Sequence, residues 1–125
     1  YIAMLDSPDV IRKKVSRAVT DSGREVKYDP ANKPEVSNLL VIYSECSGEP
    51  IPAIEARYEG QGYGQFKNDL AEAVIAVLEP IQERYYRIRQ SGDLHDILRQ
   101  GAAKAAAAAE PTLRLVKEKM GFQVI

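Results

Sequence analysis

The fold follows from residues 65–89, which read QFKNDLAEAVIAVLEPIQERYYRIR. Apolar side chains recur every three or four residues along this stretch, which is the spacing of one face of an α-helix. These positions are Phe66, Leu70, Val74, Val77, Leu78, Ile81, Tyr85 and Ile88. Pro80 lacks a backbone N–H and predicts a kink. The stretch therefore predicts one long amphipathic helix.

Four further helices are expected on either side of the long one. Ser7-Pro8-Asp9 is typical of a helix start, and Asp21-Ser22-Gly23 is typical of a stop. The buried face between them is expected to hold Ile11, Val15, Ala18 and Val19. The other expected helices cover 34–46, 52–58 and 94–121. The last of them contains an alanine-rich run at 102–109 and a second expected kink at Pro111. The helix at 34–46 is expected to end with a cap at Gly48 and to have on its inner side Val36, Leu39, Leu40 and Tyr43. The chain is thus predicted to be all-α, an irregular bundle of about five helices in a single domain over residues 1–125.

Composition excludes several classes of protein. The chain has 125 residues, with 17 Lys and Arg against 18 Asp and Glu, and its net charge of −1 argues against a basic field spread over the whole domain. The lone Cys46 excludes an internal disulfide, and no apolar run approaches the length of a membrane span. Because the chain starts at Tyr1 and not at Met, we expect a piece of a longer protein.

The residue types of catalytic and metal sites are scarce. His95 is the only histidine, and with a single cysteine it cannot make a zinc site of ordinary spacing. The glycine-rich loop at 60–64 follows a helix and not a strand, which is the wrong context for a nucleotide-binding loop. We therefore assign no catalytic residue, no metal site and no cofactor to this chain.

Two stretches favour binding of nucleic acid. Arg12, Lys13, Lys14 and Arg17 give one helix a basic face, which suits phosphates but also suits an ordinary solvated surface. Around the loop at 58–68, aromatic rings alternate with amides and a lysine. Such rings can stack on unpaired bases, whereas the alternative is a hydrophobic staple at a helix start. The residues alone leave both alternatives open.

Several short motifs occur together in a fixed order along nearly the whole chain. They are Leu5-Asp6-Ser7-Pro8, Ile11-Arg12-Lys13-Lys14, Arg17-Ala18-Val19-Thr20-Asp21-Ser22, Lys33-Pro34, Ser37-Asn38-Leu39-Leu40, Ile42-Tyr43-Ser44, Tyr58-Glu59-Gly60, Gly62-Tyr63-Gly64, Phe66-Lys67, Asp69-Leu70-Ala71 and Pro80-Ile81-Gln82-Glu83-Arg84-Tyr85. Each motif is weak alone, but as a set they are specific. The chain resembles the C-terminal helical, anticodon-binding part of the bacterial tryptophanyl-tRNA synthetases.

The resemblance implies a class I tryptophan–tRNA ligase as the whole protein. Such an enzyme uses ATP with Mg²⁺ to form tryptophanyl-adenylate and transfers the amino acid to tRNA(Trp), as a homodimer in the cytoplasm. The family's N-terminal catalytic domain, with its HIGH-like signature and KMSKS loop, has no counterpart in these residues. This chain alone is therefore expected to be inactive in adenylate formation.

The resemblance also suggests which residues contact the tRNA. By matching position, Lys67 is the first candidate, and Gln65 and Asn68 follow from proximity. The basic set Arg12, Lys13, Lys14 and Arg17 would contact the tRNA backbone or form ion pairs with the catalytic domain. The alternative function is a stand-alone helical protein–protein interaction module that docks through residues 102–109.

Overall fold

The computed structural model describes residues 1–122, and within this range it contains five α-helices and no strand. The helices are α1 (Pro8–Ser16), α2 (Pro34–Ser47), α3 (Ile51–Arg57), α4 (Tyr63–Gln90) and α5 (Asp93–Lys119). The all-α prediction is therefore confirmed. Residues 123–125, which the sequence suggests as part of a tail, lie outside the described residues.

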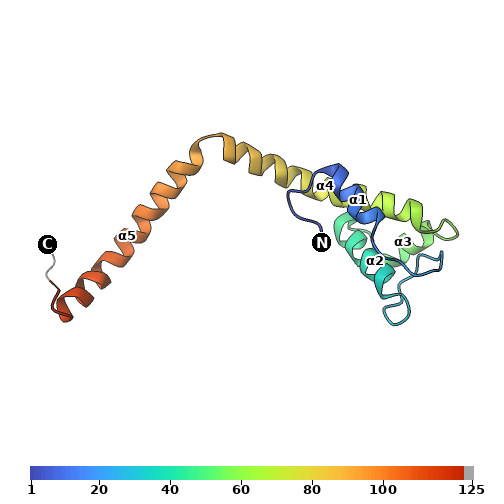
Figure 1. Ribbon diagram of the computed structural model, residues 1–125, viewed down its shortest axis with the longest axis horizontal. Coiled ribbons are helices and arrows are strands. Elements are labelled where there is room, and N and C mark those ends of the chain that lie inside the picture. The colour runs from blue at the N-terminus through green and yellow to red at the C-terminus, as the bar shows by residue number, and fades with distance from the viewer. Residues whose placement is uncertain (123–125) are drawn as a thin grey trace. The chain divides into compact units, whose positions relative to one another are not determined.

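The chain divides into two compact units, residues 1–83 and 84–125. In the first unit, α1, α2 and α3 gather around the first part of α4, as Figure 1 shows. The buried apolar residues of the described chain all belong to this unit, between Ile11 and Leu78. They include Val36, Leu39, Leu40 and Tyr43 of α2 and Phe66, Leu70, Val74 and Leu78 of α4, as helical spacing predicts.

The first helix is shorter than expected. It ends at Ser16, whose hydroxyl donates to the Lys13 carbonyl at 3.0 Å and so competes with the backbone ladder. Ala18 is only partly buried, and the side chain of Val19, predicted to be buried, is 71% exposed. The Ser7 hydroxyl makes no capping hydrogen bond, although Pro8 does occupy the first turn.

The other helix ends agree with the sequence. Gly48 ends α2 in the left-handed conformation, at φ 74°, and its N–H donates to the Ser44 carbonyl at 2.8 Å. Gly60 and Gly62 in the loop before α4 also have positive φ.

The second unit contains the end of α4 and all of α5. Helix α5 has no buried residue, and Tyr85, Ile88, Leu98 and Leu115 are among the exposed apolar side chains of this unit. The helices run through Pro80 and Pro111, and the kinks at these residues stay predictions, as does the single domain over 1–125. None of the helices within residues 1–122 has the length and apolar character needed to cross a membrane.

Candidate nucleic-acid interface

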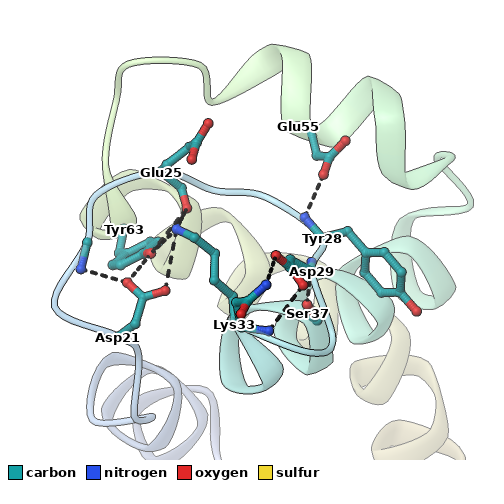
Figure 2. A network of polar contacts seen from close by, with 10 residues as sticks. Asp21, Glu25, Tyr28, Asp29, Lys33, Ser37, Glu55 and Tyr63 are labelled. Carbon is teal, nitrogen blue, oxygen red and sulfur yellow. Dashed lines mark hydrogen bonds and ion pairs between the residues drawn. The ribbon is translucent and has the colours of Figure 1, made fainter.

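A network of polar contacts holds the long connection between α1 and α2 against the start of α4 (Figure 2). The Tyr63 hydroxyl donates to Asp21 Oδ1 at 2.6 Å, and Lys33 Nζ donates to the Glu25 carbonyl at 3.0 Å and lies 3.4 Å from Asp21 Oδ2. The hydrogen bond from Tyr63 and the charge of Lys33 keep the pKa of Asp21 below its usual range. The connection therefore has a defined path although it contains no regular structure.

The second half of this connection is fixed in the same way. The Tyr28 N–H donates to Glu55 Oε1 at 2.6 Å, and the Asp29 N–H donates to the Ser37 hydroxyl at 2.8 Å. The Asp29 carboxylate accepts from the backbone of Ala31 and Asn32 and thereby closes a turn before α2. These contacts, visible in Figure 2, tie the connection to α2 and α3.

The aromatic residues near the glycine loop are mostly interior. Tyr58 is 2% exposed and Phe66 is fully buried, and their rings meet edge to face at 5.5 Å between centroids. Of the two alternatives left open, stacking of RNA bases is therefore excluded for these two rings, which pack in the core. Tyr63 stays partly exposed, but its hydroxyl is engaged with Asp21.

A line of hydroxyl groups connects the core to the exposed side of α4. The hydroxyls of Tyr43 and Tyr58 are 3.0 Å apart, and the Tyr58 hydroxyl donates to Asp69 Oδ2 at 2.7 Å. Burial, together with this hydrogen bond to a carboxylate, raises the pKa of Tyr58 far above its usual value. Tyr58 is therefore neutral at physiological pH and acts as a fixed donor to Asp69.

Asp69 in turn holds Gln65, one of the predicted contact residues. Gln65 Nε2 donates to Asp69 Oδ1 at 2.8 Å, and both residues lie on the outer side of α4. Asn68 is exposed on the same helix and makes no hydrogen bond through its side chain within residues 1–122. The sequence analysis did not select Asp69, but its place four residues after Gln65 is the spacing of side-chain neighbours on a helix.

Lys67, the first candidate, points toward the protein. Its ammonium group donates to the Ala18 carbonyl at 2.7 Å and lies 3.5 Å from Thr20 Oγ1, just beyond the end of α1. A positive charge near the C-terminal end of a helix is stabilising, because the unpaired carbonyl groups there carry partial negative charge. Lys67 therefore has a structural contact, and its role in binding RNA stays a prediction.

Two of the four predicted basic residues, Arg12 and Lys14, are engaged in ion pairs. Arg12 forms two hydrogen bonds with Glu72 on α4, at 2.6 and 3.1 Å, and these hold the pKa of Glu72 below its usual range. Lys14 lies 2.6 Å from Asp6, whose pKa is lowered by that contact, and its ammonium lies 4.9 Å from the centre of the Tyr1 ring. Both cations thus connect parts of the first unit.

The other two basic residues, Lys13 and Arg17, are exposed and have no ion-pair partner within the described part of the chain. They lie four residues apart and so share one face of α1 and its end. Of the predicted basic set, these two are the cations without an ion-pair partner among residues 1–122, so they are available to an anionic ligand.

An apolar groove of about 880 Å³ lies beside this basic face. It is lined by the N-terminal segment and by residues of α1, α2 and α4, including Ile2, Val15, Ile42 and Leu78. Lys14 and Arg17 also line this groove. Cys46 lies in it as well, and partial burial raises the pKa of its thiol, which disfavours the reactive thiolate.

The remaining polar residues considered as reactive groups are isolated. His95 is exposed in the first turn of α5. Among residues 1–122, no group of three or more His, Cys, Asp or Glu is placed to hold a metal ion. The described surface therefore offers cations, amides and an apolar groove, all of which suit binding.

Comparisons with known proteins show which proteins this chain is similar to. Residues 1–79 match the family described as tRNA synthetases class I (W and Y). The chain is 52% identical over 122 residues to the tryptophan–tRNA ligase of Oceanobacillus iheyensis and 50% identical over 122 residues to that of Bacillus subtilis, with 98% of this chain covered in both. It spans only 37% of the length of these curated relatives.

A solved structure agrees as well. The crystal structure of tryptophanyl-tRNA synthetase from Mycoplasma pneumoniae superposes on 98% of this chain and 38% of that chain, with a TM-score of 0.67 and 28% identity. The family resemblance inferred from the motifs is thereby confirmed.

Proposed function

Because the chain belongs to the class I tRNA synthetases of the tryptophan and tyrosine type, we propose that it is the tRNA-receiving, anticodon-binding part of a tryptophan–tRNA ligase. One observation carries the proposal, namely identity of about half across nearly the whole chain to relatives named tryptophan–tRNA ligase. Because the chain spans 37% of those relatives, the activity of the whole protein depends on residues that it does not contain.

In this proposal the longer protein activates tryptophan with ATP and Mg²⁺ and transfers it to tRNA(Trp). Adenylate formation belongs to a catalytic domain outside this chain, and the longer protein works as a homodimer in the cytoplasm. This chain contributes affinity for the anticodon region of the tRNA. It needs no cofactor of its own for that task.

The exposed chemistry of the first unit supports this role. Lys13 and Arg17 offer positive charge that no acidic group within residues 1–122 pairs with, and Gln65 and Asn68 offer exposed amides. Phosphate contacts by cations give affinity that falls with salt, whereas amides can distinguish bases. The near-neutral net charge of −1 implies that the attraction is local and weak.

Pyrophosphate exchange tests the division of labour. The 125-residue chain should show no tryptophan-dependent exchange of pyrophosphate into ATP, because it holds no residues of adenylate formation. Tryptophan-dependent exchange by the purified chain would overturn this part of the proposal.

Binding of tRNA(Trp) by the chain tests the other part. We expect weak binding that falls steeply as salt is raised, and weaker binding by Lys13→Met and Arg17→Met. Each lost phosphate contact should reduce the slope of log K against log salt by roughly 0.7 to 0.9. Lys104→Met, on the exposed alanine-rich part of α5, is the matched control and should change neither quantity. An affinity for tRNA(Trp) that changes neither with salt nor on substitution of Lys13 and Arg17 would contradict the proposal.

A second candidate is a helical module that binds another protein. The observation that favours it is α5, which has no buried residue and carries a run of small side chains at 102–109. The upstream reading frame separates the two candidates. A nucleotide-binding fold that ends in a KMSKS-like loop would support the ligase, and a start codon directly before Tyr1 would support the module.

A further inference from the structure

We propose that Gln65 recognises the exocyclic amino group of an unpaired RNA base, and that Asp69 is the positioning residue that sets this preference. The inference rests on the proposed function and adds to it the chemistry of the base that is accepted. It is carried by the short path of hydrogen bonds that joins Gln65 to the buried tyrosines.

The direction of every hydrogen bond along this path follows from chemistry. An ionised carboxylate only accepts, so the Tyr58 hydroxyl donates to Asp69 Oδ2 and the Gln65 amide nitrogen faces Asp69 Oδ1. Since the Tyr58 hydrogen is used, the Tyr43 hydroxyl donates to Tyr58. Arg57 can only donate, and its Nη1 lies 3.4 Å from the Tyr43 oxygen. The path therefore has one consistent orientation, from Arg57 to Asp69.

The path also fixes the Asp69 carboxylate in place. Tyr43 and Tyr58 are 5% and 2% exposed and pack with Phe66, so their hydroxyls are held by the core. Asp69 Oδ2 accepts a hydrogen bond from the buried Tyr58 hydroxyl, and Asp69 Oδ1 accepts one from the exposed Gln65 amide. Rotation of Asp69 would break two hydrogen bonds, one of them to a buried hydroxyl.

The outward face of Gln65 is thereby polarised. Asp69 holds one hydrogen of Gln65 Nε2, and within the described residues the amide oxygen Oε1 has no hydrogen-bond partner. The negative charge of Asp69 lies next to the amide nitrogen, so it disfavours a base carbonyl oxygen that would accept from the second amide hydrogen. A base that offers an amino hydrogen is attracted to this pair, while one that offers a carbonyl oxygen at the same place is repelled.

Cytosine and uracil form the sharpest probe of this polarity. They have the same size, but cytosine carries an amino group at position 4 where uracil carries a carbonyl oxygen. Bases in a single-stranded loop expose this edge, which is buried in a paired helix. The pair Gln65 and Asp69 should therefore prefer cytosine to uracil at one position of the bound loop.

Changing Asp69 to asparagine should reverse the preference. Tyr58 still donates toward the core side, so the oxygen of the asparagine stays there and its amide nitrogen turns toward Gln65. Gln65 then rotates its oxygen inward and presents its nitrogen, a donor, to the solvent. The negative charge is removed at the same time, so a base carbonyl is now favoured.

The experiment measures binding of the 125-residue chain to RNA stem-loops that carry the anticodon loop of tRNA(Trp), with each loop cytosine changed singly to uridine. Fluorescence anisotropy at one fixed low salt concentration gives the affinities. At one position the wild type should lose about tenfold on the change to uridine. Asp69→Asn should instead bind the uridine form more tightly at that same position. Gln65→Met should bind both forms equally, and Gln100→Met in α5 is the matched control that keeps the wild-type preference.

The outcomes separate this inference from the proposed function. Salt-dependent RNA binding with no cytosine preference, or with a preference that Gln65→Met retains, overturns the role of Gln65 and leaves the proposed function standing. An unchanged preference in a folded Asp69→Asn overturns the role of Asp69. If that variant does not fold, Asp69→Ala takes its place, and a wild-type preference in Asp69→Ala overturns the role of Asp69. Absence of any RNA binding by the wild type overturns the proposed function and this inference together.

Discussion

Replacement of Lys67 by methionine separates a structural role of this lysine from a role in binding RNA. Methionine keeps most of the aliphatic stem and removes the ammonium group. That group donates to the Ala18 carbonyl at 2.7 Å and lies 3.5 Å from Thr20 Oγ1, beyond the last turn of α1. The substitution therefore leaves a partly buried carbonyl without its donor.

The size of the effect follows from these contacts. A hydrogen bond from a charged donor contributes about 1.5–3 kcal/mol, and a cation near a helix C-terminus adds about 0.3–1 kcal/mol. Lys67 is only partly buried, so water compensates for part of the lost interaction energy of its ammonium group. We therefore expect a loss of about 1–2 kcal/mol in the free energy of unfolding. Lys13→Met, which removes an exposed lysine of α1 that has no partner in the described chain, should stay within about 0.5 kcal/mol of wild type.

Urea unfolding followed by near-ultraviolet circular dichroism measures this difference. The chain has no tryptophan, so the signal comes mainly from tyrosines, and the buried Tyr43 and Tyr58 report on the first unit. With a urea dependence near 1 kcal/mol per molar, the midpoint of Lys67→Met should fall by about 1–2 M. If the urea midpoint of Lys67→Met stays within about 0.3 M of the wild-type midpoint, the contact between Lys67 and the end of α1 is refuted.

Three further changes test other parts of the structure. The pKa of Asp21 is lowered in the folded chain, mainly by the hydrogen bond from the Tyr63 hydroxyl. The Asp21 carboxylate therefore contributes fully to stability above the pKa of the unfolded state, about 3.9, and this contribution is lost as pH falls through the lower pKa of the folded state. The urea midpoint should therefore drop less steeply on acidification in Asp21→Asn than in wild type. Pro80→Ala restores a backbone donor within α4 and should stabilise the chain by about 1–3 kcal/mol, with increased helicity by circular dichroism. Because partial burial raises the pKa of Cys46, its alkylation by iodoacetamide at neutral pH should be several-fold slower in the folded chain than in urea, measured by mass spectrometry.

Helical spacing predicted the core well because it depends on one physical rule. Residues three or four apart share a face, so the apolar positions of α2 and of α4 up to Leu78 were assigned correctly, except Val77, which is 42% exposed. Past Leu78 the same spacing continues to Ile81, Tyr85 and Ile88, yet these side chains are 39–44% exposed. Periodicity identifies an apolar face but does not say whether anything in the chain covers it.

The directions of the polar side chains could not be predicted from the sequence. Arg12 and Lys13 are neighbours with similar chemistry, but Arg12 reaches Glu72, sixty residues away, and Lys13 reaches no acidic group in the described chain. Such pairings depend on tertiary contacts that leave no local pattern. The same holds for Lys67, whose partner lies 49 residues earlier in the chain.

The contact of Lys67 with α1 is compatible with the predicted role of this lysine in binding RNA, and it leads to a test of coupling. An ammonium group has three hydrogens, and two of them are directed at Ala18 and Thr20, so one remains for a phosphate. That phosphate would lie beside the end of α1, next to Arg17, the residue before Ala18.

If Lys67 and Arg17 bind the same phosphate, the losses of RNA affinity in Lys67→Met and Arg17→Met should not add. The loss of binding free energy in the double variant should then differ from the sum of the two single losses by about 0.5–1 kcal/mol. The same cycle built with Lys13→Met in place of Lys67→Met is the control for a general effect of lost charge. Additive losses in the Lys67 cycle would mean that the two residues contact separate phosphates, or that Lys67 acts on RNA only by holding α1 in place.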